Sequence, residues 1–437
     1  MVAIGLDYGT SHCAAGLAVP GRAPRLLPLG PASATTPATL MPSLLWAPNV
    51  RFELDYDRTG RLRTDTARFQ NLAFGDAALE RYLEAPEQGY YVKSPKSFLG
   101  APGLAPEVRE RFVRLVAAMM AEVRRCAEQA LDEPVTAATI GRPVNFQGPS
   151  GSVENETALG MLRAAAAQAG IDEVAFLYEP LAAALEYEAR LNGEERVLVV
   201  DIGGGTTDCS FVRVGPDHAG GLDRSGDVLG HSGERIGGND YDQALAFTAA
   251  VPELGWQEER RDGLPVPNHY FVDAISINDV NAQARFYAAA TGERLEELVG
   301  EIDGPSRLPR LLELFERRGS YRLLRAFERG KIALSETAAV SVALDFFAAP
   351  FSVAIDQDGL HTAVTGLLEH LRASVRETLK QAGTEPDAVY LTGGMAQSPV
   401  VRRALEAVLG EVPVLDSDHF ASVTEGLSLD ASKRFAA

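Results

Sequence analysis

Two acids flank a run of glycines at residues 201–208, which read DIGGGTTD. Consecutive glycines let a backbone approach a ligand closely and turn its amides toward an anion such as a phosphate. The carboxylates of Asp201 and Asp208 would repel that phosphate unless a divalent cation lay between them, or unless one of them oriented a water molecule. The plain alternative is a glycine-rich hairpin turn. We interpret the segment as a turn that binds phosphate together with a metal ion.

The chain repeats this pattern near its start. Residues 4–10 read IGLDYGT and lead into the apolar run 14–19, just as DIGGGTTD leads into the run 210–214. A second match follows in each half, because 138–143 (ATIGRP) and 389–394 (VYLTGG) both read as strands that end in glycine. The order is the same in both halves, which predicts a duplicated α/β protein.

The elements that position these motifs alternate between strands and helices. A helical period is clearest at 157–169, 181–191 and 308–334. Insertions at about 46–99, which is polar and rich in turns, and at about 241–334, which is mostly helical, interrupt the two halves.

The duplication predicts two lobes with one insertion each. We expect an N-terminal lobe over 1–195 and a C-terminal lobe over 196–437. The glycine-rich segment 219–238 is predicted to form a hairpin and loops.

Other motifs for nucleotide binding or catalysis do not occur in the sequence. It has no GxxxxGK[ST] loop, which excludes a P-loop enzyme. The dinucleotide fingerprint needs a third glycine where the chain has Asp208, and a helix where the chain has a strand. No HExxH or GxSxG is present, so zinc peptidase and nucleophile-elbow chemistry have no support.

The composition of the chain bears on which classes of partner it can bind and on where in the cell it is expected. The chain has 41 basic and 60 acidic residues, and the resulting net charge of −19 repels nucleic acid and anionic membranes. Cys13, Cys126 and Cys209 form no CxxC pair, so we expect neither disulfides nor zinc, and small buried thiols at 13 and 209. The start lacks a basic leader and no apolar run reaches the ~20 residues that span a bilayer. A cytoplasmic protein without nucleic-acid or membrane partners is predicted.

These motifs and several others resemble the nucleotide-binding half of the heat-shock protein 70 family, the DnaK-type chaperones. The matching segments are 7–10 (DYGT), 201–208 (DIGGGTTD), 178–184 (YEPLAAA), 237–242 (GGNDYD), 328–335 (ERGKIALS) and 391–394 (LTGG). Segments 93–100 (KSPKSFLG) and 140–146 (IGRPVNF) are most similar to a short, chaperone-like branch of that family. The resemblance implies an actin-like ATPase fold of duplicated, ribonuclease H-like lobes.

The resemblance also implies a Mg²⁺ and ATP/ADP site. Asp7 and Asp201 would hold Mg²⁺ through its waters, and Lys96 would contact the γ-phosphate and orient the attacking water. Glu179 and Asp208 would complete the set that positions this water. The implied nucleotide-binding residues are Gly9, Thr10, Ser11, His12, Gly203, Gly204, Gly205, Thr206, Gly237, Gly238, Glu328, Lys331, Ser335, Gly393 and Gly394. The implied reaction is slow hydrolysis of ATP that drives a conformational switch.

The residues by themselves allow simpler interpretations of three of these positions. A lone Lys96 before an apolar loop is typical of a solvated surface residue. Glu179 precedes Pro180, so it can be a helix N-terminal charge favoured by the helix dipole. Glu328, Lys331 and Ser335 share one face of a helix, which can be a solvated charged face.

The sequence departs from the chaperone pattern on the adenosine side. Ile332 stands where those chaperones usually carry Arg, and Met395 and Gln397 stand where they carry Ser and Arg. An Arg stacked on a base contributes roughly 0.5–2 kcal/mol, so we expect weaker nucleotide affinity or a changed base preference. After the segment 425–427 no leucine-rich linker and no peptide-binding domain is expected.

Three other functions stay open from the sequence. The protein could be a nucleotide sensor or scaffold that leaves ATP uncleaved, which Ile332, Met395 and Gln397 favour. It could be a kinase of the same superfamily, with Glu179 or Asp208 as the catalytic carboxylate beside a hydroxylated metabolite. A filament-forming protein is the third, and the sequence names no client or co-chaperone for any of them.

Overall fold

The computed structural model describes residues 2–33, 36–48, 53–85, 88–101, 103–144, 146, 153–219, 221–415 and 421–435. Asn145, which belongs to one of the segments used for the resemblance, lies outside them. The chain forms two compact units: unit 1 comprises Met1–Arg235, Ala373–Ala396 and Val408–Ala437, and unit 2 comprises Ile236–Arg372 and Gln397–Ala407. The predicted lobe boundary at 195/196 lies inside unit 1, at the start of the strand β10 (Glu195–Ile202), and the two-lobe division stays a prediction.

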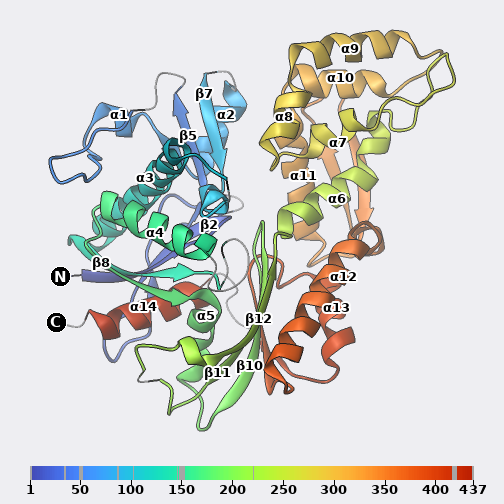
Figure 1. Cartoon of the computed structure of the whole chain (residues 1–437). Coiled ribbons are helices and arrows are strands. Elements are labelled where there is room, and N and C mark those ends of the chain that lie inside the picture. The colour runs from blue at the N-terminus through green and yellow to red at the C-terminus, as the bar shows by residue number, and fades with distance from the viewer. Residues whose placement is uncertain are drawn as a thin grey trace. The chain divides into compact units, whose positions relative to one another are not determined.

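The first sheet of unit 1 has the strand order β3-β2-β1-β8-β9 (Figure 1). Its strands are β1 (Val2–Tyr8), β2 (His12–Leu17), β3 (Arg25–Leu26), β8 (Val135–Arg142) and β9 (Glu173–Tyr178), and β4 (Leu40–Pro42) also pairs with β2. β1 is antiparallel to β2 and parallel to β8. Apolar residues run almost continuously along β1 and β8 because helices cover both faces of the sheet. The helices α3 (Pro106–Leu131) and α4 (Val153–Gln168) cover one face of the sheet and share a buried core with these strands.

The second sheet of unit 1 repeats that arrangement. Its order is β12-β11-β10-β15-β16, with strands β10 (Glu195–Ile202), β11 (Thr207–Val214), β12 (Val228–Glu234), β15 (Ala388–Thr392) and β16 (Val414–Leu415). β10 is antiparallel to β11 and parallel to β15, as β1 is to β2 and β8. The predicted duplication, a hairpin followed by a parallel strand in each half, is confirmed in a mixed α/β fold with two mixed sheets.

Two helices pack against each other on the inner faces of these sheets. α5 (Glu179–Glu188) contacts β10 and β11, while α14 (Ser422–Arg434) contacts β1, β2 and β8 (Figure 1). Their crossing is so close that a Cβ on Gly426 would overlap the carbonyl oxygen of Ala182. A Cβ on Gly5 of β1 would likewise overlap the backbone nitrogen of Ser428. Glycine is therefore required at both positions, where backbones meet without room for a side chain.

A small sheet in the predicted 46–99 insertion carries the Lys96 turn. Its order is β6 (Ala73–Phe74), β5 (Leu44–Pro48), β7 (Gly89–Lys93), and it lies with α1 (Ala67–Gln70) and α2 (Asp76–Glu84). The 3-10 turn η1 (Pro95–Phe98) follows β7 directly. The predicted polar insertion is thus an ordered sheet with two helices.

Unit 2 is mostly helical, as predicted for 241–334. It contains α6 (Gly238–Ala249), η3 (Val251–Leu254), α7 (His269–Ile275), α8 (Val280–Phe286), α9 (Ala289–Gly300), α10 (Leu308–Glu316), α11 (Ser320–Ala333) and the hairpin β13 (Ala339–Leu344)–β14 (Phe351–Asp356). The helical period at 308–334 is confirmed as two helices, because Arg318 adopts a φ of 48° between the end of α10 and the start of α11. The glycine-rich segment 219–238 contributes η2 (Ser225–Asp227) and β12. The two remaining helices of the chain are α12 (Gln357–Ala382) and α13 (Pro399–Leu409).

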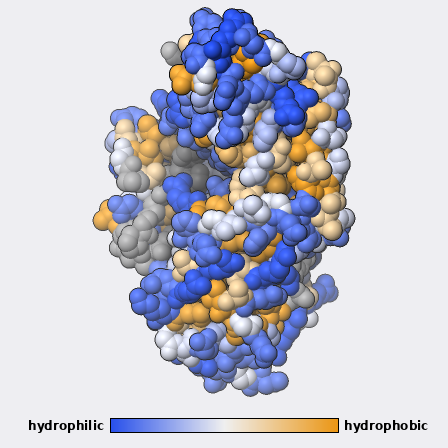
Figure 2. Space-filling model, turned by 90° about the vertical axis from the view of Figure 1, so that its right-hand side faces the viewer, coloured by the Kyte–Doolittle hydropathy of each residue, from blue (hydrophilic) through white to orange (hydrophobic). Residues whose placement is uncertain are grey.

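Hydrophilic residues cover much of the face seen in Figure 2. The large apolar side chains that are exposed, such as Val19, Tyr90 and Leu264, come from separate segments, as is usual for a folded protein. Among the described helices, none combines the length and the apolar composition required to cross a membrane. Cys13, Cys126 and Cys209 are free and buried, which confirms the expectation for the thiols at 13 and 209.

Candidate functional site

The two glycine hairpins adopt the same turn. Gly9 N–H donates to the carbonyl of His12 at 3.0 Å, and Gly203 N–H donates to the carbonyl of Thr206 at 2.9 Å. The first turn leaves no room for a side chain, because a Cβ on Gly9 would collide with the His12 carbonyl oxygen. Their residues are half-buried, which leaves the backbone accessible to a ligand: Gly9, Thr10, Ser11, His12, Gly203, Gly204, Gly205 and Thr206.

The two hairpins carry an aspartate at the same position of their first strand, but only the second hairpin carries another aspartate on its second strand. Asp7 pairs with Ala14 across β1 and β2, whereas Asp201 pairs with Asp208 across β10 and β11. The turns also lie side by side, since a Cβ on Gly205 would be 3.3 Å from Cγ2 of Thr10. The second copy therefore contributes one more carboxylate to a shared site than the first.

Lys96 reaches this site from the small sheet. Ser94 adopts the left-handed conformation (φ 54°) immediately before η1 and turns the chain so that Lys96 Nζ lies 2.6 Å from Glu179 Oε1. The Lys96 side chain is only 7% exposed, so the surface alternative for this residue is wrong. Glu179 is the first residue of α5, where the helix dipole favours a negative charge, and it also pairs with the lysine.

Burial and mutual repulsion shape the titration of the three aspartates. Burial raises the pKa values of Asp7, Asp201 and Asp208 to about 7 each, and the charge of Glu179 adds to the increase. The Lys96 ammonium opposes these shifts. For Lys96, burial alone would lower the pKa, but the charges of Glu179, Asp7 and Asp208 outweigh it and raise the pKa. Among the described residues, four half-buried acids thus act on the single ammonium of Lys96 or are acted on by it.

A divalent cation suits this excess of negative charge. Oxygen donors and a net negative site are what Mg²⁺ requires, and Mg²⁺ commonly keeps most of its waters. In the described part of the chain, no three His, Cys, Asp or Glu side chains are grouped closely enough to ligate one ion directly. The residues present fit a divalent cation, and its retention by Asp7 and Asp201 through water molecules stays a prediction.

The nucleotide-free protein should be more stable at pH 8 when Asp201 is replaced by Asn. The pKa of Asp201 is about 7 in the folded protein and 3.8 in its ordinary state, so the folded protein holds the extra proton between those values. This carboxyl therefore lowers stability progressively as pH rises through that range. Asp201→Asn should raise the free energy of unfolding by about 2 kcal/mol at pH 8 and by much less at pH 5.

Thermal melts of both proteins at pH 5 and pH 8, without nucleotide and with EDTA, measure this difference. Asp217→Asn, at an exposed position of the same unit, is the control and should leave both melting temperatures unchanged. A variant that is less stable than wild type at both pH values contradicts the buried-repulsion argument.

Gly393 joins this site in unit 1. It follows β15 with a φ of 84°, and a Cβ there would collide with the Ile202 carbonyl and lie 2.6 Å from Asp201 Oδ1. The adjacent Gly394 is exposed, whereas the side chain of Met395 is buried. Gly393 therefore lies directly against the Asp201 hairpin, and the approach of its backbone to a nucleotide stays a prediction.

Five predicted nucleotide-binding residues lie in unit 2: Gly237, Gly238, Glu328, Lys331 and Ser335. There, the Lys331 ammonium donates to the Gly238 carbonyl at 2.9 Å and pairs with Asp242 at 2.9 Å. Lys331 is buried, so α11 does not present it as a solvated charge. Glu328 pairs with Arg325 on its own helix at 2.7 Å, and Ser335 is half-buried after α11.

Sequence reasoning missed two residues of these sites. Ser43 donates its hydroxyl to the Gly9 carbonyl at 2.6 Å, and Asp242 forms the ion pair with Lys331. Asp242 lies within the GGNDYD segment, so the recognised spacing of that segment could have identified it as a site residue. No sequence pattern could have identified Ser43, because a serine between two apolar stretches has no distinguishing feature.

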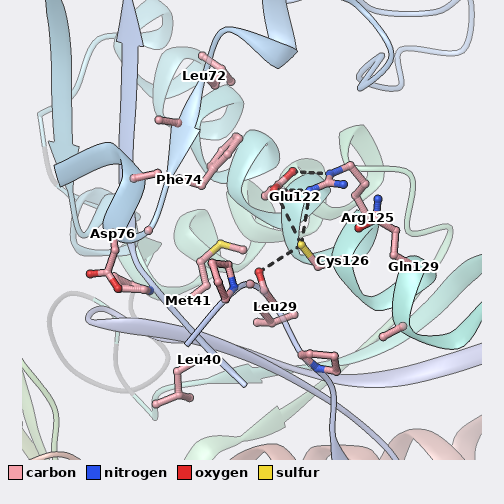
Figure 3. A pocket seen from close by; sticks show the side chains of 18 of the residues that line it. Leu29, Leu40, Met41, Leu72, Phe74, Asp76, Glu122, Arg125, Cys126 and Gln129 are labelled. Atoms are coloured by element: carbon pink, nitrogen blue, oxygen red, sulfur yellow. Dashed lines mark hydrogen bonds and ion pairs between the residues drawn. The ribbon is translucent and has the colours of Figure 1, made fainter. Parts of the chain in front are cut away.

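A separate cavity of about 710 Å³ in unit 1 contains none of the predicted site residues (Figure 3). It lies among β4, β6, α2 and α3, with Met41, Leu72 and Phe74 as apolar lining. Cys126 in its wall donates to the Leu29 carbonyl at 3.3 Å. Burial raises the pKa of this thiol to about 11, so it stays protonated at neutral pH. The cavity is therefore distinct from the acidic site.

Comparisons with known proteins give one consistent match. The model of the family described as "Hsp70 protein" matches residues 109–251 and 314–432. "Chaperone protein dnaK3" of Synechococcus elongatus is 27% identical over 323 residues, covering 71% of this chain and 34% of that protein. "Chaperone protein DnaK" of Elusimicrobium minutum is 25% identical over 439 aligned positions, covering 98% of this chain and 57% of that protein. "Chaperone protein DnaK" of Thermus thermophilus is 26% identical over 298 residues, covering 66% and 38%. The chain thus spans 34–57% of the length of these relatives.

Proposed function

This chain belongs to the Hsp70 family, and we propose that it binds Mg-ATP and hydrolyses it slowly to ADP and phosphate as a conformational switch. The observation that carries the proposal is the set of half-buried acids Asp7, Asp201, Asp208 and Glu179 around the buried Lys96, at the mouth of two matching glycine hairpins. A kinase or a sensor of the same superfamily would use the same hairpins, so the test must measure the fate of the γ-phosphate.

In this proposal, residues of the chain bind the phosphates, orient the attacking water and accept its proton. Amides of the two hairpin turns would hold the phosphates, and Asp7 and Asp201 would hold the ion through its waters. When bound, Mg²⁺ neutralises charge that develops between the β- and γ-phosphates. Lys96 donates to the γ-phosphate and orients the water, as a preorganised cationic donor does at a site of developing charge.

The acids beside Lys96 accept the proton of the attacking water. A bond forms between the water oxygen and the γ-phosphorus while the bond from that phosphorus to the ADP oxygen breaks. The proton passes to the carboxylate of Asp208 or Glu179. Burial gives Asp208 a pKa of about 7, which suits proton transfer near neutral pH.

The adenosine side is proposed to be altered. Gly393 and Gly394 in unit 1, and Gly237, Gly238, Glu328, Lys331 and Ser335 in unit 2, are the proposed contacts. The Lys331 ammonium is bonded to Asp242 and Gly238, and Ile332 is 53% exposed where the chaperones carry a cation. These features support weaker affinity or a changed base preference, and they favour a nucleotide sensor as the second candidate function.

The wider setting is also part of the proposal. The matching sheets support an actin-like fold with lobes over 1–195 and 196–437. The segments 93–100 and 140–146 support a relationship to the short chaperone-like protein YegD. The acidic net charge of −19 supports a cytoplasmic protein without nucleic-acid or membrane partners.

Single-turnover hydrolysis of bound ATP with Mg²⁺ tests the proposal. Wild type and the control Asp217→Asn should convert ATP to ADP at the same rate, while Asp201→Asn should lose at least about 10²-fold, because it removes a group that holds the ion. Bound ATP that wild type leaves uncleaved would establish the sensor. Turnover that rises only when a hydroxylated metabolite is added would establish the kinase.

A further inference from the structure

Ser43 joins two parts of the site that are distant in sequence. Its hydroxyl donates to the Gly9 carbonyl at 2.6 Å, and its N–H donates to the Ser11 carbonyl at 2.8 Å. Its own carbonyl accepts from Ser94 N–H at 2.8 Å. One buried residue between β4 and β5 therefore bonds both the first phosphate hairpin and the turn that carries Lys96.

The hydroxyl bond sets the direction of a backbone amide. The described chain contains no cis peptide bond, and in a trans peptide the C=O and the next N–H point in opposite directions. Holding the Gly9 carbonyl toward Ser43 therefore turns the N–H of Thr10 away from Ser43 and fixes its direction. Because Ser43 has a single hydroxyl proton, the Cys13 thiol 3.5 Å away can only donate to the Ser43 oxygen, which completes a short chain of donors.

The hydrogen bond that the Ser43 carbonyl accepts acts on the turn that carries Lys96. Ser94 holds a left-handed conformation that is unfavourable for a residue with a side chain. Its N–H bond to Ser43 contributes to keeping that conformation, and the conformation directs Pro95 and Lys96 toward Glu179. A shift of Ser43 would therefore displace the Thr10 amide and the Lys96 ammonium together.

We propose that Ser43 is a positioning residue that holds the Thr10 amide and the Lys96 ammonium in register for the phosphates of one nucleotide. The inference rests on the proposed function, because it requires phosphates to bind at this hairpin. It assigns to Ser43 an effect on phosphate binding and on hydrolysis, beyond its contribution to folding.

Ser43→Ala tests the proposal because it removes the hydroxyl and leaves the two backbone bonds. We expect the Kd for Mg-ATP to rise about tenfold and the single-turnover rate to fall about tenfold, the loss typical of one buried hydrogen bond. Ser43→Thr retains the hydroxyl and should stay within about threefold of wild type. Ser210→Ala is the matched control, since Ser210 is equally buried and its hydroxyl has no hydrogen-bond partner among the described residues.

Two outcomes overturn the proposal: Ser43→Ala behaves as wild type, or Ser43→Ala and Ser210→Ala lose the same amount. Should Ser43→Ala fail to fold, Ser43→Cys takes its place, with a smaller loss expected from its weaker donor. If the wild-type protein binds no ATP, that result contradicts the proposed function rather than the role of Ser43. In that case hydrogen exchange in the nucleotide-free protein still tests Ser43: Ser43→Ala must speed exchange in 9–13 and in 94–99 together, and unchanged exchange refutes the positioning role.

Discussion

Single-turnover hydrolysis of Mg-ATP is expected to slow by about 10²–10³-fold when Lys96 is replaced by alanine. The ammonium lies among four half-buried acids of the described chain, and it is held 2.6 Å from Glu179 rather than in solvent. A donor fixed in advance stabilises developing charge at little cost in reorganisation. Rapid-quench measurement of ADP formation from pre-bound ATP gives the rate directly.

The same substitution should weaken the fold, and this effect has to be separated from the catalytic one. Glu179 would lose its partner while it stays buried, and removing one member of a buried pair costs about 3–5 kcal/mol. The double variant Lys96→Ala/Glu179→Gln removes the stranded charge, so it should recover most of the stability and none of the rate. Lys380→Ala is the control, because that lysine is 81% exposed. A folded Lys96→Ala protein with the wild-type rate would remove Lys96 from the mechanism.

Gly426→Ala is expected to lower the free energy of unfolding by about 3 kcal/mol or more. The added methyl group would overlap the Ala182 carbonyl oxygen, which is backbone and cannot rotate aside. α14 would have to move away from α5, which would open packing around Leu427, Leu181 and Ala183. Chemical denaturation, with an unchanged m-value as the check on two-state behaviour, measures the loss.

Gly160→Ala is the matched helical control for that substitution. Gly160 lies within α4, and apart from its chain neighbours and the surrounding turns of its own helix backbone, nothing lies within 4 Å of the position that its Cβ would take. Alanine there should be neutral or stabilise the protein by up to about 1 kcal/mol, through helix propensity alone. Equal stabilities for the two variants would show that the α5–α14 crossing adjusts more freely than its geometry indicates.

The sequence predicted the parts of the site that depend on local patterns. Each hairpin carries its Asp, its glycine turn and its second strand within about ten residues, so the repeat revealed both copies and the parallel strand after each. The equivalence of Asp7 and Asp201 follows from that repeat and is confirmed by the strand register. Lys96 and Glu179 are 83 positions apart, and their pairing was accessible only through the family resemblance.

What the sequence did not predict depends on tertiary contacts. Ser43 acts through hydrogen bonds to residues far along the chain, which no spacing rule encodes. The break between α10 and α11 comes from one residue with positive φ inside a continuous helical period. Lys331 and Asp242 were both in recognised segments, but the pairing of one with the other requires α6 and α11 to pack.

The packing of α14 on β1 has a consequence for how the protein is made. The ribosome delivers β1 first and α14 last of the described helices, so one face of the N-terminal sheet has no cover while the intervening residues are translated. At roughly 5–20 residues per second this interval lasts tens of seconds. During that time the nascent chain exposes an apolar surface that only its own later segment fits. The N-terminal sheet therefore completes its packing only after α14, more than 400 residues later, has been translated.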